Sequence, residues 1–335
     1  MTYPGVFCIS LDFELHWGCF ERMNLQTEAE LRYFQNTREL IPKKLNMFAD
    51  GGIHVTWATV GMLFLQNKEE WERRKPAILP TFDNPQVSAY EWIAKYGFNG
   101  SEDPYHFAPS LVDLIMATPH QELATHTYAH YFCLEAGQTR EQFRVDMEIA
   151  CQLAKERGTT LKSLVFPRNQ FNQDYLSVCR DLGISSVRSS PDIWYWSPAT
   201  HSSFMKKFFR AGDAYIKFQP IKPVYLKDIN VDQGLPLLLP STRLYRPWMP
   251  GEPLKNKLKL RRILNEMTDA ARNQAYYHLW WHPHNFGNNP KECLQELEQI
   301  IAHFHKLHKT YGFQSMHMQD ISELLLSSAK TTVRA

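Results

Sequence analysis

Short apolar runs alternate with longer amphipathic stretches along nearly the whole chain. Apolar runs of strand length, several rich in β-branched and aromatic residues, predict seven buried strands, at residues 5–13, 53–63, 122–126, 161–167, 184–190, 235–242 and 275–282. Stretches with helical spacing lie between them, at residues 28–52, 109–118, 140–158, 173–183, 254–273 and 290–312. Residues 313–321 are expected to hold a last strand.

Glycine and proline mark the ends of several elements. Gly158 and Gly183 close two of the predicted helices, and Pro42 indicates a new start inside the first. Two stretches lack a clear period, the polar, proline-rich residues 66–108 and the aromatic, basic residues 191–234. We expect both to be irregular insertions.

The repeated order of strand and helix predicts a parallel sheet with crossover helices. No G-x-G-x-x-G or G-x-x-x-x-G-K-[ST] follows a predicted strand, so nothing favours an open nucleotide-binding sheet. The predicted fold class is therefore α/β, a distorted (β/α)7-type barrel in which residues 1–335 form one domain. In such barrels the chemistry collects at the carboxyl ends of the strands.

Polar side chains gather where the predicted strands end. In chain order these candidates are Asp12, Glu14, His126, His130, Arg168, Asp192, His282 and His284. Each alone has an ordinary explanation, such as a turn cap or a surface arginine. Their common position at strand ends favours a site, and residues i and i+2 of a strand share a face, which pairs Asp12 with Glu14.

The chemistry open to this set is narrow. One carboxylate and two neutral imidazoles form a divalent metal site with positions left for water. A second carboxylate can take a proton from the attacking water, and a separate histidine can protonate a leaving group. An arginine can keep the base ionised, and an aspartate can keep the acid histidine charged. The set is suited to metal-assisted hydrolysis of an amide or ester.

Composition excludes several other classes of protein. The 335 residues include 44% apolar and 21% charged residues with a net charge of +2, which argues against a nucleic-acid partner. Six cysteines form no C-x-x-C pair, the first residues lack a basic leader, and no apolar run approaches membrane-spanning length. We expect a cytoplasmic location.

At these strand ends the chain resembles the NodB-type polysaccharide deacetylases. Their T-F-D-D-G motif is matched by "SLDFE" at 10–14, with Phe13 in place of the second aspartate, and their H-[ST]-x-x-H motif by "HTYAH" at 126–130. Looser matches are "WATVGML", "FPRNQF", "PDIW" and "LWWHPHNF". The resemblance covers roughly residues 5–320 and implies a distorted (β/α) barrel that removes acetyl groups from sugars with a divalent metal.

The resemblance also implies roles for single residues. Asp12 would be the general base steadied by Arg168, and His282 the general acid partnered by Asp192. The metal would be held by Glu14, His126 and His130, with zinc expected and cobalt, nickel or manganese open. An exchange of roles between Asp12 and Glu14, and His284 in place of His282, remain alternatives. A backbone N–H near Tyr131, or among the strand neighbours of Leu134, is expected to help hold the oxyanion.

The expected substrate is an acetylated sugar, linked to a nucleotide or a lipid during O-antigen or capsule synthesis, with deformylation as an alternative. A metal-independent amidohydrolase is a second hypothesis. A third is a barrel without activity that binds a glycan through tryptophans, namely Trp17, Trp194, Trp196 and Trp248. The stretch "FMKKFFR" at 204–210 is either a contact with an anionic membrane that carries a lipid-linked substrate or a solvated loop.

Overall fold

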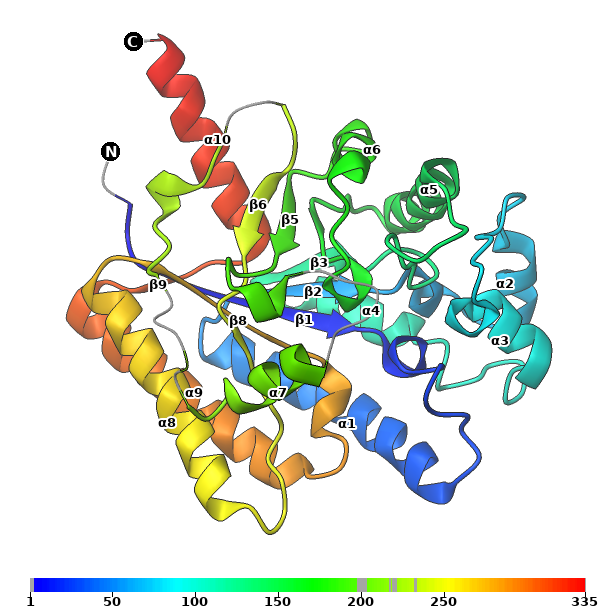
Figure 1. Ribbon diagram of the computed structural model, residues 1–335, viewed down its shortest axis with the longest axis horizontal. Coiled ribbons are helices and arrows are strands. Elements are labelled where there is room, and N and C mark those ends of the chain that lie inside the picture. The colour runs from blue at the N-terminus through cyan, green and yellow to red at the C-terminus, as the bar shows by residue number, and fades with distance from the viewer. Residues whose placement is uncertain (1–2, 198–203, 217, 219–221, 232–233, 335) are drawn as a thin grey trace.

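The computed structural model describes residues 3–197, 204–216, 218, 222–231 and 234–334. It shows parallel strands curled into an incomplete barrel with helices outside (Figure 1), in the order β6-β5-β4-β3-β2-β1-β8-β7, with β9 beside β1. The strands are β1 (Val6–Phe13), β2 (Val55–Thr59), β3 (Gln121–Thr125), β4 (Ser163–Leu164), β5 (Ser186–Ser189), β6 (Leu237–Pro240), β7 (Arg243–Leu244), β8 (Tyr276–Trp281) and β9 (Gln314–Ser315). The prediction of a distorted parallel barrel is confirmed.

The central strand is β1, which pairs in parallel with both β2 and β8. All eight of its residues are buried, because helices cover the outside of the sheet and side chains fill the inside. Its carboxyl end therefore opens at the middle of the barrel rim, where Asp12 and Glu14 stand. A strand at the sheet's edge would have exposed them.

Between β6 and β7 the chain moves from one edge of the sheet to the other. Strand β6 pairs with β5, and β7 pairs with β8. At the step between them, the Ser241 N–H donates to the Ser189 carbonyl, and the Thr242 N–H donates to the carbonyl of His278. This switch brings β5 and β8, which are distant in sheet order, around one interior.

The helices are α1 (Glu28–Asp50), α2 (Lys68–Arg74), α3 (Ala89–Tyr96), α4 (Pro109–Ala117), α5 (Arg140–Glu156), α6 (Leu176–Asp181), α7 (Phe204–Gly212), α8 (Pro253–Arg272), α9 (Pro290–Tyr311) and α10 (Met318–Arg334). Helix α1 continues through Pro42, so the predicted new start there is wrong. A proline inside a helix costs about 3 kcal/mol. Here the apolar face continues on both sides of it, with Leu40, Ile41 and Leu45 buried in the core.

Three predicted segments differ from the structure. Residues 66–108 are not irregular throughout, since they contain α2 and α3. In the second insertion α7 is helical, while residues 198–203, 217, 219–221 and 232–233 lie outside the described part. The last strand is only β9, and α10 follows it at once. Its buried Met318, Ile321 and Leu325 have helical spacing, which the sequence analysis missed.

No helix within the described ranges combines the length and the apolar character that crossing a bilayer requires.

Candidate active site

Two carboxylates at the end of β1 point to the barrel interior. Asp12 and Glu14 are each 2% exposed. Between them Phe13 turns the other way and packs edge-on against Trp57, with ring centroids 6.1 Å apart. The alternation of a strand thus places two acids on one face and a core residue on the other.

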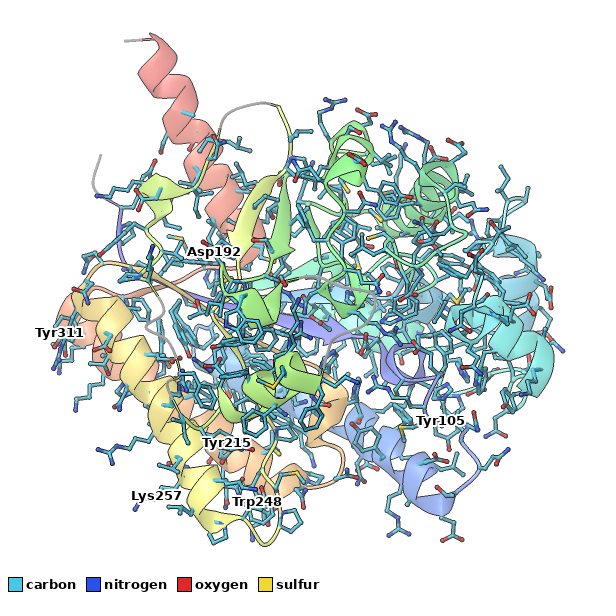
Figure 2. All side chains as sticks on the ribbon, viewed as in Figure 1. Tyr105, Asp192, Tyr215, Trp248, Lys257 and Tyr311 are labelled. Carbon is cyan, nitrogen blue, oxygen red and sulfur yellow. The ribbon has the colours of Figure 1, made fainter. Side chains whose placement is uncertain are left out.

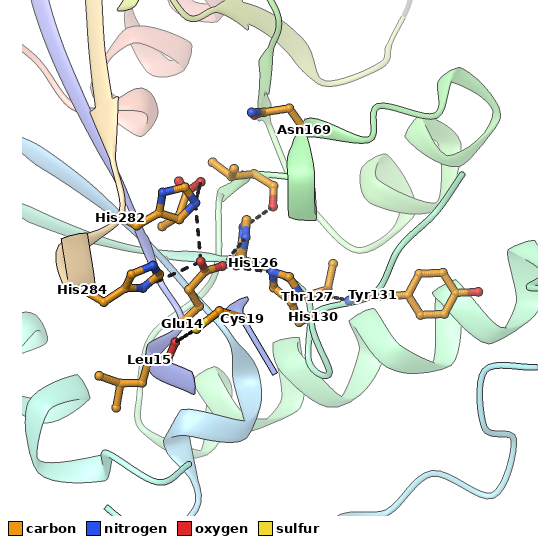
Figure 3. A network of polar contacts seen from close by, with 12 residues as sticks. Glu14, Leu15, Cys19, His126, Thr127, His130, Tyr131, Asn169, His282 and His284 are labelled. Atoms are coloured by element: carbon orange, nitrogen blue, oxygen red, sulfur yellow. Dashed lines mark hydrogen bonds and ion pairs between the residues drawn. The ribbon is translucent and has the colours of Figure 1, made fainter. Parts of the chain in front are cut away.

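Two imidazoles from the loop after β3 meet the Glu14 carboxylate (Figure 3). Glu14 Oε2 lies 3.2 Å from His126 Nε2 and 3.0 Å from His130 Nε2. Both histidines are buried. Burial by itself would raise the pKa of the Glu14 carboxyl, but the charge of the neighbouring His282 holds that pKa well below its usual range. The carboxylate is thereby kept ionised.

The three ligand atoms fit a divalent cation. Glu14 Oε2 and His126 Nε2 are fully buried, yet neither has a hydrogen-bond partner among the described residues. His126 Nδ1 lies 2.8 Å from the Val165 carbonyl, which can only accept, so Nε2 presents its lone pair to Glu14. Two ligands of a tetrahedral zinc ion, each about 2.0–2.1 Å from the metal, lie about 3.3 Å apart. The observed spacing therefore suits ligands that face one ion.

The loop that carries the histidines is held in a strained conformation. Thr127 has a φ of 64° and His130 a φ of 53°, values unusual for side chains with a Cβ. Thr127 Oγ1 accepts a hydrogen bond from the Tyr131 N–H at 2.7 Å. The Asp146 carboxylate accepts from the N–H groups of Tyr128 and Ala129 at 2.7 and 3.0 Å. These bonds fix the direction of both imidazoles. They also occupy the Tyr131 N–H that we expected at the oxyanion.

Glycine at position 18 leaves room for the Glu14 carboxylate. A Cβ built on Gly18 would overlap the carboxylate of Glu14. The turn after β1 (Leu15–Gly18) brings the two residues together, and Leu15 in it has a φ of 45°. The stretch from Glu14 to Gly18 therefore forms a receptacle in which the Glu14 carboxylate lies against Gly18. The sequence pattern did not predict this close approach.

Asp12 is held by Arg188 and not by Arg168. Arg188 donates from Nη1 and Nη2 to the two Asp12 oxygens at 2.6 and 2.7 Å, and its side chain has no exposure. Burial would raise the pKa of the Asp12 carboxyl, but the Arg188 guanidinium lowers it. Arg168 instead pairs with Glu21 and lies 3.7 Å from Glu135. Arg188, in the middle of β5, thus holds Asp12 in the way that was expected of Arg168.

A signal for Arg188 was present in the sequence. The run "ISSVRSS" reads as a buried strand, and an arginine inside such a strand requires a buried acidic partner. Because Arg188 lies inside its strand, the pattern of polar residues at strand ends does not reveal it.

Two histidines from the end of β8 face the other Glu14 oxygen. His282 Nε2 lies 3.5 Å from Glu14 Oε1 and 3.7 Å from Asp12 Oδ2, and its side chain is 28% exposed. His284 Nδ1 lies 3.9 Å from Glu14 Oε1. Burial lowers the pKa of His284 to about 3, so its ring is neutral near pH 7. Of the two, only His282 can meet a substrate from outside.

Comparison with known proteins identifies the fold. No family model and no curated protein sequence matches the chain. A Mycobacterium smegmatis protein assigned as a polysaccharide deacetylase superposes with a TM-score of 0.61 at 13% identity, over 98% of this chain and 92% of the other. A Pseudomonas aeruginosa PAO1 protein with the same assignment gives 0.53 at 12% identity, over 95% and 89%. The chain has the fold of the NodB-type polysaccharide deacetylases.

The polysaccharide deacetylase fold also supports other chemistry. The allantoinase PuuE superposes with a TM-score of 0.52 at 13% identity, over 95% of this chain and 89% of the other. At these identities the likeness concerns the fold alone. The roles of single residues have to be argued from the geometry of this chain.

Asp192 does not lie beside His282 in this deacetylase fold. It is exposed and lines a cavity of about 650 Å³ between the end of β5, the start of β8 and α8. The polar contacts of His282 among the described residues are with Asp12, Glu14 and Asn285. The expected pairing is therefore wrong, because Asp192 lies against that cavity beyond the end of β5, and Asp12 itself lies beside His282.

A second group of possible ligands lies at the opposite end of the barrel, before β2 and at the start of α10. His54, His317 and Asp320 place ligand atoms within 4.8 Å of one another. His317 Nδ1 accepts from the Asp320 N–H at 3.1 Å, while Asp320 Oδ2 accepts from the His317 N–H at 3.1 Å. These reciprocal bonds cap α10, which explains the cluster without a metal.

We expect Arg188→Met to destabilise the protein far more than Arg168→Met. The first change leaves a buried carboxylate without its partner, which costs about 3–5 kcal/mol. The second removes a partly exposed pair worth about 1 kcal/mol or less. Urea unfolding measures both. Adding Asp12→Asn should recover part of the stability lost in Arg188→Met, and equal losses in the two single variants would contradict the assignment of Arg188.

Gly18→Ala should weaken metal binding while leaving the fold largely intact. The added methyl group displaces the Glu14 carboxylate, a flexible side-chain end, from the imidazoles. We expect at least about a tenfold rise in the Kd for Zn²⁺, of the size caused by disturbing groups around a metal ligand. Isothermal titration with Zn²⁺ measures it. The control is Gly158→Ala, whose added Cβ meets no neighbour but strains a backbone with a φ of 77°, so it shows how far a general loss of stability changes the affinity. Unchanged affinity in Gly18→Ala would refute the receptacle.

Proposed function

We propose that the protein is a metal-dependent deacetylase that hydrolyses the acetamide of an acetylated sugar. The observation that carries the proposal is the convergence of Glu14 Oε2 with the Nε2 atoms of His126 and His130, at 3.2 and 3.0 Å. A divalent cation bound by these atoms polarises a carbonyl and lowers the pKa of water. The other polar groups at the rim have the positions needed to move protons.

Asp12 is the proposed general base. Arg188 occupies one lone pair on each of its oxygens, and a carboxylate oxygen has a second lone pair for the attacking water. Because Arg188 lowers the pKa of Asp12, the carboxylate is ionised near neutral pH, which is the state that a general base requires. Glu14 is the poorer base, since its Oε2 faces two imidazoles.

His282 is the proposed general acid. It is the accessible member of the pair with His284, and its Nε2 lies 3.7 Å from Asp12 Oδ2. Asp12 can thus take up a proton, and His282 can release one, at neighbouring atoms of the same site. The 3₁₀ turn η8 (Pro283–Phe286) after His282 is fixed from α1, where Lys44 Nζ donates to the Pro283 carbonyl at 2.8 Å.

The proposed substrate is a sugar linked to a nucleotide or a lipid, as in O-antigen or capsule assembly in the cytoplasm. Its support is the resemblance to sugar deacetylases together with the aromatic rim of the site. Trp280 packs against His282 with ring centroids 5.8 Å apart, and Trp196 packs against Trp280 at 6.5 Å. Trp280 itself is buried, so the partly exposed Trp196 is the ring that provides apolar surface for a sugar face. We keep zinc as the expected metal because imidazole and carboxylate ligands suit it.

Two other functions are less well supported. A metal-independent amidohydrolase would leave the buried Glu14 and His126 atoms without partners, which is costly. A barrel that only binds a glycan through tryptophans loses one of the expected contacts, because Trp17 has no exposure.

His126→Ala and His282→Ala should fail in different ways. We expect His126→Ala to lose bound metal and activity together, because it removes a ligand. His282→Ala should retain the metal but lose turnover by about 10²–10⁴-fold, the contribution of a positioned acid. Metal content by mass spectrometry and acetate release from N-acetylated sugars give the two readouts. Wild-type turnover in His282→Ala would remove the acid from the mechanism.

A further inference from the structure

Exposed apolar side chains are concentrated in one part of the described chain. Among all the described residues, twelve large hydrophobic side chains are prominently exposed, and nine of these twelve fall between residues 194 and 258. These nine are Trp194, Phe204, Met205, Phe208, Ile216, Phe218, Met249, Leu254 and Leu258. We call this set the apolar rim patch. An apolar surface of this kind marks a contact with another body.

Helix α7, at the centre of the patch, exposes apolar side chains to the outside. Phe204, Met205 and Phe208 are 79%, 54% and 58% exposed, and no residue of the helix is buried. Two of its cations, Lys206 and Arg210, turn toward the protein, while Lys207 is exposed. Lys206 Nζ donates to Ser197 Oγ at 2.6 Å, and Arg210 donates to the Tyr195 carbonyl. The apolar face of an amphipathic helix thus points to the outside, the reverse of a helix that packs on a core.

The two halves of the patch are joined by contacts around α7. Arg246 Nη2 donates to the Arg210 carbonyl at 3.1 Å, which brings the loop before α8 against α7. Asp213, just after α7, pairs with Arg243 at 3.0 Å and with Arg262 at 3.1 Å. Figure 2 shows Tyr215, Trp248 and Lys257 in the same region of the surface. The outward position of α7 is therefore built into the fold by buried charges.

The same part of the chain is strongly basic. Residues 194–262 contain thirteen Lys and Arg but four Asp and Glu. The whole chain has 37 Lys and Arg and 35 Asp and Glu, so the remainder has a net negative charge. Lys207 and Lys257 are exposed, and neither has a recorded partner among the described residues. Arg243, Lys259 and Arg262 are buried and paired with acids, so they add nothing to the surface charge. The apolar rim patch still lies within a strongly cationic portion of the sequence.

We infer that the apolar rim patch docks the protein on the surface of an anionic lipid bilayer, with α7 lying in the plane of the headgroups. Exposed phenylalanine, methionine and leucine beside lysine are the chemistry of an interfacial helix. Nucleic acid would match the charge but not the aliphatic side chains. A second copy of the chain would bring two cationic surfaces together.

The docked surface adjoins the candidate active site. Arg210 of α7 lies over Trp196, and Trp196 contacts Trp280, whose ring packs on His282. Docking through the patch therefore places the rim with His282 near the headgroups. The docking itself does not depend on the hydrolase activity. Only the further step, that it presents lipid-linked sugars to the site, rests on the proposed function.

Cosedimentation with vesicles tests the inference. Wild type should bind vesicles of phosphatidylcholine mixed with phosphatidylglycerol, bind pure phosphatidylcholine much more weakly, and release as salt rises. Phe204→Ser/Phe208→Ser should lose at least about tenfold in partition, because it removes the buried apolar area. The matched control, Ile78→Ser/Leu114→Ser, changes exposed apolar residues elsewhere and should bind as wild type does.

A charge-reversal pair keeps the test decisive if the serine variant fails to fold. Lys207→Glu/Lys257→Glu should weaken vesicle binding, while Lys291→Glu/Lys309→Glu, at exposed sites outside the patch, should not. Absence of vesicle binding by wild type would overturn the inference, as would a dimer in light scattering that the Phe204→Ser/Phe208→Ser change dissociates. Binding to duplex DNA but not to vesicles would also overturn it. None of these results bears on acetate release from soluble sugars.

Discussion

The rest of the site depends on how the buried charge of Glu14 is balanced. A carboxylate removed from water is stable only where donors or cations surround it. Glu14 is 2% exposed, and imidazoles from the ends of β3 and β8 face its two oxygens. Its Oε2 has no hydrogen-bond partner among the described residues, and a divalent cation held there, as proposed above, would complete the balance. This one requirement explains the strained histidine loop, the glycine at position 18 and the burial of both imidazoles.

A polar network behind the site links three strands of the barrel. Arg188 on β5 holds Asp12 and also donates to Ser10 Oγ at 3.0 Å, both on β1. His278 on β8 lies 2.8 Å from the same Ser10 Oγ. Such interior bonds are sensitive to register, since a slip of one residue would turn each side chain outward. The network that orients Asp12, the proposed base, therefore also fixes how β5, β1 and β8 meet.

The sequence predicted the parts of the protein that depend on local pattern. Alternating strands and helices follow from periodicity, and the place of Asp12, Glu14, His126 and His130 follows from strand ends meeting at one rim. Partners across the barrel could not be predicted in this way. Arg188 and Arg168 both follow Asp12 by more than 150 residues, and only the turn after β4 shows which one points inward. The predicted pairing of Asp192 with His282 was wrong for the same reason, because Asp192 lies in an insertion and not in a strand.

The most direct measurement is an anomalous-scattering map at the zinc edge from crystals grown with Zn²⁺. The account predicts one strong peak about 2.0–2.1 Å from the Nε2 atoms of His126 and His130 and within about 2.2 Å of a Glu14 oxygen. A map with no peak between these three side chains, or with zinc bound only at His54 and Asp320, would contradict it.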